Sequence, residues 1–573
     1  MTARWRIATA TLVVAALLGA PGPLSTVPSA AAARYTEVPF DSLATDDRVV
    51  ASLVRIEQPL PDELGAPRAC DFIESERWRT RGGPKRTARA DIVFVAIPGF
   101  LGGAGSFDQL ARNTVLRASR HGRDAEFYAL DRRANCLEDD HGIAAAVAAA
   151  DPRRAYDYYW NRAEVAGRRF GGFETATSAS FVGSFGLKRT MRDWNTVVKA
   201  IMPGRKRRAR KLLCGGHSLG GPLTALFSSW DFDGDPSTHS DAGYKQCAGL
   251  FGLDTTVSIG SGGGSAVSGP LLDLANASPA PFLDVTPLTP ETIQLTAAFG
   301  VGAYFRPDGT ELIDGLPSTA NIEGANRALF SRDAAQAATG IPDIRDFELS
   351  NETVMGGVFD DNSANSLSFI RASLGFLAPG RPLVDKNFPN PGDGTYALPD
   401  DPAAGHYNWD SYAEVGRGGR EITANDGGLA YTNRESEISS LKQFSRAFID
   451  GPINFIEQYF PTKLITDVAA AETGSFDEVA YNGPAKRPVL LLHAGDSSSN
   501  GGIDSGPPIA GSAANERPLS ADWTLPGYNH LDVLTAARRQ NDHRPEPTST
   551  LLADWGRAVV KMRRTKPNGP GER

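Results

Sequence analysis

Short apolar runs alternate with stretches of helical pattern in two parts of the chain, over residues 91–255 and again after residue 485. The apolar runs lie at 91–97, 125–131, 212–214, 248–254 and 488–493. Runs that lack polar alternation are typical of parallel strands covered on both faces. The pattern therefore predicts an α/β protein with a doubly wound, mostly parallel sheet.

The segment between these two parts has a different pattern. Residues 256–484 are rich in Gly, Pro, Asn and Asp and show only scattered helical patterns, for example over 444–459. We therefore expect a core in two parts, 34–255 and 485–573, with a large, mainly helical and loop-rich insertion between them.

The N-terminus has the pattern of a secretory signal. Arg4 and Arg6 precede an apolar run over 7–20, and small residues follow at 31–33. The apolar run is too short for a permanent membrane-spanning helix, although an N-terminal anchor is the alternative interpretation. We expect residues 1–33 to be removed and the mature chain to be secreted.

The four cysteines fit an oxidising compartment, in which an even number suggests disulfides. Three pairings are possible. Cys214 ends one predicted strand and Cys247 begins the next apolar run, so these two can be neighbours in a sheet, which would leave Cys70 to pair with Cys136. A buried free thiol at Cys214 is the alternative.

Charge argues against a nucleic acid or an anionic membrane as the main partner, because the net charge of the chain is −8. One basic run, residues 205–211, precedes the predicted strand at 212–214 and contains no aromatic residue. We expect it to be a solvated loop rather than a polyanion site.

A serine motif carries the first chemical signal. The sequence Gly-His-Ser-Leu-Gly at 216–220 lies between the predicted strand at 212–214 and a helical pattern at 223–227. A strand that turns directly into a helix brings its flanking residues so close together that only glycine avoids a clash. The pattern predicts a nucleophile elbow that exposes the hydroxyl of Ser218.

A glycine-rich turn at residues 98–103 follows the first predicted parallel strand. Attack on an ester or amide creates a negative oxygen, which needs hydrogen-bond donors placed where the charge develops. We assign this role to the backbone N–H groups of Phe100 and Leu219.

A serine nucleophile needs a base, and the base needs a carboxylate that fixes its tautomer. His530 lies in a loop between a predicted strand and a C-terminal helix, whereas His217 is inside the elbow and points the wrong way to serve its neighbour. Asp496 follows the apolar run at 488–493 and precedes His530, so we expect it to be the acid. Asp254, at the end of the run 248–254, is the rival.

Taken together, these features resemble the α/β-hydrolase superfamily over residues 86–255 and 485–565. The resemblance implies a catalytic triad of Ser218, Asp496 and His530, and a cap formed by the insertion that follows the strand after the elbow. Pro98 and Gly99 stand where many relatives carry His-Gly, which keeps the backbone donor but does not point to a particular lipase subfamily.

The resemblance leads us to expect a secreted serine hydrolase that cleaves carboxylic esters without a cofactor. Its substrate could be a small-molecule, lipid or polymer ester. The same triad could instead act on an amide, a peptide or a lactone, and a non-catalytic binding protein on a hydrolase scaffold is a further possibility.

Alternating carboxylates at Asp231, Asp233 and Asp235 resemble part of a calcium loop. A complete loop would have Gly at its sixth position and Glu at its twelfth, but Pro236 and Ala242 occupy these positions. We therefore expect a solvated turn and no metal site.

Overall fold

The computed structural model describes residues 35–260, 267, 269–365, 367–389, 396–412, 437–495, 519–540 and 543–565. The expected signal segment, residues 1–33, and the expected acid, Asp496, lie outside these residues. Within the described ranges, no helix has both the length and the apolar character needed to cross a bilayer.

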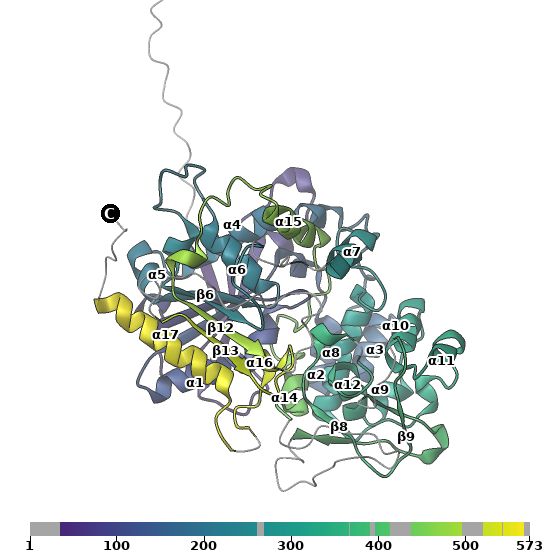
Figure 1. The fold of residues 1–573 in the computed structure, drawn as a ribbon. Coiled ribbons are helices and arrows are strands. Elements are labelled where there is room, and N and C mark those ends of the chain that lie inside the picture. Colours follow the sequence, from purple (N-terminus) through teal and green to yellow (C-terminus); the bar gives the residue numbers. More distant parts are fainter. Residues whose placement is uncertain are drawn as a thin grey trace, which may run out of the picture. The chain divides into compact units, whose positions relative to one another are not determined.

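A nine-stranded sheet organises the chain, in the order β1-β2-β3-β5-β4-β6-β7-β12-β13. Figure 1 labels three of its strands, β6, β12 and β13. Its strands are β1 (Tyr35–Pro39), β2 (Val49–Glu57), β3 (Phe72–Thr80), β4 (Ile92–Ile97), β5 (Ala125–Leu130), β6 (Leu212–His217), β7 (Gly249–Leu253), β12 (Val489–Ala494) and β13 (Ala521–Leu525). The pairs from β5 to β13 are parallel, and the pairs among β1, β2, β3 and β5 are antiparallel. The mostly parallel sheet is confirmed.

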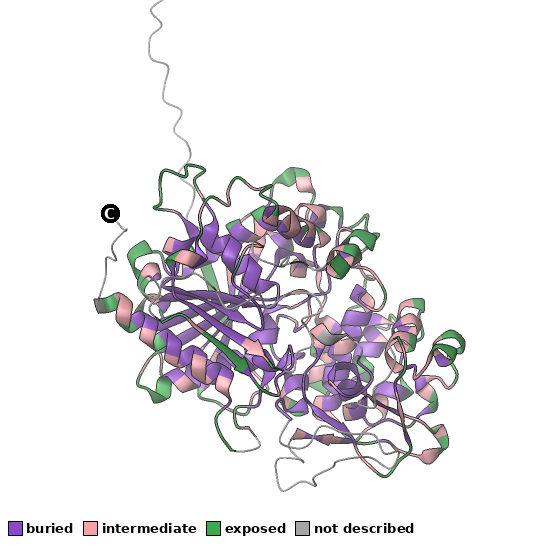
Figure 2. Cartoon of the chain, in the orientation of Figure 1, coloured by how far each residue is buried: buried purple, intermediate pink, exposed green. Residues whose placement is uncertain are grey.

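Helices cover both faces of this sheet, and the alternation along β4 shows how. Ile92, Phe94 and Ala96 belong to an apolar core that includes α1 and α17, whereas Val93 and Val95 belong to one that includes α4, α6 and α15. The helices are α1 (Asp108–Arg120), α4 (Leu187–Ile201), α6 (Gly220–Ser229), α15 (Thr462–Glu472) and α17 (Pro547–Thr565). The central strands are accordingly buried along their whole length (Figure 2). The expected double covering is confirmed.

The chain leaves the sheet between β7 and β12. The α-helices among the described residues of this segment, besides α15, are α7 (Gly269–Ala277), α8 (Pro290–Phe305), α9 (Glu311–Asp314), α10 (Ala320–Phe330), α11 (Ala334–Thr339), α12 (Asn351–Phe359) and α14 (Leu441–Ala447). Two small antiparallel pairs accompany them, β8 (Gly375–Leu377) with β11 (Trp409–Ser411) and β9 (Leu383–Asp385) with β10 (Ala397–Pro399). The segment is thus mainly helical and rich in loops.

Part of the first core segment packs with this insertion rather than with the sheet. Helices α2 (His141–Ala149) and α3 (Arg153–Tyr159) contribute side chains to the apolar core that surrounds α8 and α12. Tyr156 and Tyr158, for example, share this core with Phe299 and Phe359.

Two local predictions were wrong. The basic run is a helix, α5 (Arg205–Lys211), and not a loop. Arg and Lys favour helices, and Arg208 is buried, where its guanidinium donates to the carbonyls of Met202 and Pro203.

The pattern over 444–459 is helical only as far as the end of α14. α14 ends at Ala447, and Gly451, with a φ of +116°, and the proline after it prevent a helix from running through the rest of this range.

The disulfides pair as the sequence suggested. Cys70 is bonded to Cys136, and Cys214 is bonded to Cys247. Cys214 lies on β6 and Cys247 shortly before β7, the neighbouring strand, so the sheet itself brings them together.

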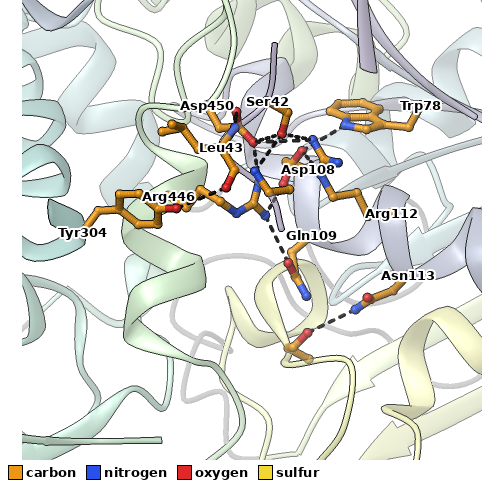
Figure 3. Close-up of polar contacts among 12 residues, drawn as sticks. Ser42, Leu43, Trp78, Asp108, Gln109, Arg112, Asn113, Tyr304, Arg446 and Asp450 are labelled. Carbon is orange, nitrogen blue, oxygen red and sulfur yellow. Dashed lines mark hydrogen bonds and ion pairs between the residues drawn. The ribbon is translucent and has the colours of Figure 1, made fainter. Parts of the chain in front are cut away.

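A buried ion network joins α14 of the insertion to α1 beside the sheet (Figure 3). Arg446 contacts Asp108 at 2.5 Å and also binds Asp450. Arg112 contacts Asp108 at 2.7 Å and Asp450 at 3.4 Å, and the indole N–H of Trp78 donates to Asp108. Two guanidinium groups thus face two carboxylates with no net charge, which limits the cost of burying them.

Candidate active site

Ser218 sits at a strained turn between β6 and α6, with a φ of +54°. A Cβ added to Gly216 would lie 2.5 Å from the backbone of Gly220, and one added to Gly220 would lie 2.3 Å from the carbonyl oxygen of Ile97. The N–H of Ser218 donates to the carbonyl of Leu253 on the neighbouring strand, at 3.1 Å. This is the strand, sharp turn and helix that the motif predicts, with glycine required at both flanking positions.

The turn after β4 approaches Ser218 from the neighbouring strand. A Cβ on Gly99 would lie 2.5 Å from the Cβ of Ser218 and 3.1 Å from its Oγ. Within the described part of the chain, the backbone N–H groups of Phe100 and Leu219 donate to no protein acceptor. Two unused N–H donors therefore flank the serine, as an oxyanion site requires.

His530 binds the carboxylate of Asp254. Its Nδ1 lies 2.6 Å from Asp254 Oδ2, and both side chains are buried. Asp254 follows β7, and its other oxygen accepts the N–H of Ala494 at the end of β12, at 2.9 Å. The carboxylate that binds His530 is thus that of Asp254, the rival candidate. The expected acid, Asp496, lies outside the described residues.

The electrostatics of this pair decide which nitrogen of His530 can act as a base. Burial by itself would raise the pKa of Asp254, but the hydrogen bond and positive charge of His530 and the N–H of Ala494 lower it to about 2. An ionised Asp254 accepts the Nδ1 proton of His530. In the neutral form of the ring, the lone pair is then on Nε2.

His217 has a role that the sequence did not reveal. Its Nε2 lies 2.9 Å from the carbonyl oxygen of His530, and the two rings are 4.4 Å apart. Burial and the neighbouring His530 lower the pKa of His217 to about 3, so its ring is neutral and donates to that carbonyl. His217, the residue before Ser218, therefore anchors the loop that carries His530.

Through His217, the elbow that carries Ser218 contacts the loop that carries His530. Among the described residues, no hydrogen bond joins Ser218 Oγ to His530 Nε2. Such bonds are often long in unliganded enzymes and shorten when a substrate binds.

Aromatic side chains from the insertion lie beside the glycine-rich turn. The ring of Phe100 is 5.6 Å from that of Phe369 and 5.0 Å from that of Phe460. The half-buried Phe100 and Phe369 give this side of the turn an apolar character.

The structure also brings three carboxylates together at the other end of α6. Oxygens of Asp231, Asp233 and Asp241 lie within 4.8 Å of one another. Asp241 was not part of the sequence pattern, and Asp235 is not in the group. The group follows the last residue of α6, whereas Ser218 precedes the first turn of this helix, so a cation there would be remote from Ser218.

Comparisons with known proteins give distant structural neighbours. No protein-family model and no curated protein sequence matches the chain. A peroxisomal alpha-beta-hydrolase from Saccharomyces cerevisiae has a TM-score of 0.31 at 10% identity, over 91% of this chain and 99% of that one. A juvenile hormone epoxide hydrolase from the silkworm Bombyx mori has a TM-score of 0.27 at 11% identity, over 93% and 78%. An acetyl xylan esterase from Paenibacillus sp. R4 has a TM-score of 0.19 at 12% identity, over 39% of this chain and about half of the esterase, 52%.

TM-scores this low carry no argument about this chain. The classification rests on the chain itself, because parallel strands in the order β5-β4-β6-β7-β12-β13 place an elbow serine after β6 and a histidine loop after β13. On these grounds the chain has the α/β-hydrolase fold.

Proposed function

We propose that this chain is a serine hydrolase that cleaves carboxylic esters, with Ser218 as nucleophile, His530 as base and Asp254 as acid. The observation that carries the proposal is the 2.6 Å contact between His530 Nδ1 and Asp254 Oδ2, next to a serine held at a positive φ. Asp254 takes the role that the sequence assigned to Asp496.

In the proposed reaction, Nε2 of His530 removes the proton of Ser218 as the serine oxygen attacks the carbonyl carbon. The ionised Asp254 stabilises the positive charge that develops on the imidazole. The N–H groups of Phe100 and Leu219 stabilise the negative oxygen of the tetrahedral intermediate. His530 then protonates the leaving alcohol, and water that His530 activates releases the acid from Ser218. The scheme requires no cofactor.

The apolar rings beside the glycine-rich turn support an ester with an apolar acyl or alcohol part, from a small molecule, a lipid or a polymer. Phe369 and Phe460 both belong to the insertion, which supports a role for it as a cap that lines the substrate site. The two disulfides and the N-terminal sequence pattern support secretion.

The test is hydrolysis of chromogenic esters of graded acyl length by the purified mature chain, beside Ser218→Ala. We expect turnover by the wild type and none by the variant, and the preferred acyl length would show the size of the pocket. Turnover of amides or lactones alone would replace the ester proposal. Equal turnover by both proteins would exclude Ser218 as the nucleophile.

A further inference from the structure

A buried arginine lies behind the glycine-rich turn, which we call the oxyanion loop (residues 98–103). The guanidinium of Arg132 donates to the carbonyls of Pro98 at 2.6 Å, Gly99 at 2.8 Å and Gly102 at 2.9 Å. The guanidinium also forms an ion pair with Glu457, whose Oε2 lies 2.7 Å from Nη1 of Arg132. One side chain therefore fixes three of the carbonyls of the loop.

The bond to Gly99 determines which way Phe100 presents its N–H. A trans peptide is planar, and its C=O and N–H groups point in opposite directions. The carbonyl of Gly99 faces Arg132, so the N–H of Phe100 in the same peptide unit faces away from Arg132. Gly99 is the residue of the oxyanion loop that approaches Ser218. The hydrogen bond from Arg132 to the carbonyl of Gly99 therefore orients the N–H of Phe100, the proposed oxyanion donor, beside the serine.

Glu457 extends this support into the insertion. Its N–H donates to the carbonyl of Leu101 at 2.8 Å, and the N–H of Gly103 donates to the carbonyl of Phe455 at 2.9 Å. The ring of Phe460 packs against the guanidinium of Arg132, 4.9 Å from its Cζ. The insertion thus pairs with the oxyanion loop through both its backbone and its side chains.

The conformation of the loop needs such support. Leu101 has a φ of +58°, which is unfavourable for a residue with a side chain and persists only where surrounding contacts impose it. Arg132 is 4% exposed and Glu457 is fully buried, so their contacts act in a water-poor region where hydrogen bonds to charges are strong.

We propose that Arg132 and Glu457 are positioning residues that hold the Phe100 N–H in place to stabilise the transition state. The proposal rests on the proposed function, because it assigns Phe100 to the oxyanion site. It also gives the insertion a part in catalysis, through Glu457, that is separate from substrate binding.

The test is the double variant Arg132→Met/Glu457→Gln, which removes both charges and leaves no buried ion without its partner. Arg133 and Asp193 provide a matched control. Arg133 is also buried, binds Asp193 through two nitrogens at 2.7 and 3.0 Å, and donates to the carbonyls of Gln58 and Cys70. Arg133→Met/Asp193→Asn therefore removes a similar ion pair away from the oxyanion loop.

We expect the Arg132 double variant to lose about 10²-fold in kcat, the effect of misplacing one oxyanion donor, with KM within about twofold of the wild-type value. The control should lose thermal stability to a similar extent but keep kcat within about threefold. Wild-type kcat in the Arg132 variant, or an equal fall in kcat in both variants, would overturn the proposal.

Hydrogen exchange separates this proposal from the proposed function, because it needs no substrate. The backbone amides of residues 99–103 should exchange faster in the Arg132 variant, and their exchange should be unchanged in the control. If the wild type cleaves no ester but the loop loses protection, the proposed function fails while the structural support stands. If exchange in the loop does not change, Arg132 and Glu457 do not position it.

Discussion

Asp254 Oδ2 lies 2.6 Å from His530 Nδ1, although 276 positions separate the two residues in the chain. β7 and β12 are parallel neighbours, so the residues that follow them emerge at the same edge of the sheet. The backbone N–H of Ala494 at the end of β12 donates to Asp254 and fixes the carboxylate from that side.

This contact predicts which aspartate is the acid. Asp254→Asn should lower kcat by about 10⁴-fold, because an amide cannot hold His530 in the tautomer that leaves Nε2 free to accept a proton. Asp496→Asn should stay within a fewfold of the wild type. Steady-state kinetics on the preferred chromogenic ester measures both, and the reverse ranking would return the role to Asp496.

The close approach of the oxyanion loop to the nucleophile predicts the effect of one methyl group. Gly99→Ala places a Cβ 2.5 Å from the Cβ of Ser218, so the loop or the serine must move. We expect kcat to fall by about 10- to 100-fold. Gly82→Ala, where nothing lies within 4 Å of the added Cβ, is the control and should change neither kcat nor the melting temperature. Full activity in Gly99→Ala would contradict the geometry.

The buried His217 predicts an acid-sensitive contribution to stability. Its pKa is about 3 when folded against 6.5 as the ordinary value, so between these pH values the unfolded chain binds the extra proton. The contribution is complete above pH 6.5 and is lost as the pH falls toward 3, by at most about 1.4 kcal/mol per pH unit.

Urea unfolding at several pH values measures this effect. In His217→Gln, whose amide can still donate to the carbonyl of His530, the free energy of unfolding should fall less steeply with acid than in the wild type. His406→Gln serves as the control and should keep the wild-type slope. Identical slopes in His217→Gln and the wild type would show that His217 does not carry the effect.

The ion network between α1 and α14 predicts a large loss of stability on breaking it. Arg446→Met leaves Asp108 and Asp450 short of a buried cation and should lower the free energy of unfolding by about 3 to 5 kcal/mol. Arg153→Met, which removes an exposed pair with Asp151, should change it by less than about 1 kcal/mol. Denaturant melts compare the two, and similar losses would contradict the difference in burial.

The three carboxylates at the end of α6 predict the outcome of chelation. Asp231, Asp233 and Asp241 follow the last turn of the helix, and Ser218 precedes its first turn. Removal of divalent cations should therefore leave kcat unchanged. Assays with and without a chelator test this, and a loss of turnover that calcium restores would link this turn to the active site.

Some of the sheet was not predictable from apolar patterning. The apolar pattern predicts no strand before residue 91, whereas β2 and β3 lie at 49–80. β3 carries Glu76 and Arg77 at buried positions, and Arg77 pairs with Glu126 on the neighbouring strand at 2.6 Å. Charged residues in a buried strand mask the apolar pattern, and burial of the Arg77 guanidinium is tolerable only because Glu126 pairs with it from a strand far along the chain.

The elbow shows what the sequence by itself determined. Its geometry is local, because β6, the turn and α6 are consecutive in the chain and the clashes that require glycine arise among residues close in sequence. The cysteine pairs could likewise be proposed from the expected order of strands. The choice between Asp254 and Asp496, and the support of the oxyanion loop by Glu457, depended on the tertiary structure. These contacts join residues hundreds of positions apart, so their distances follow from how strands and the insertion pack and not from any local pattern.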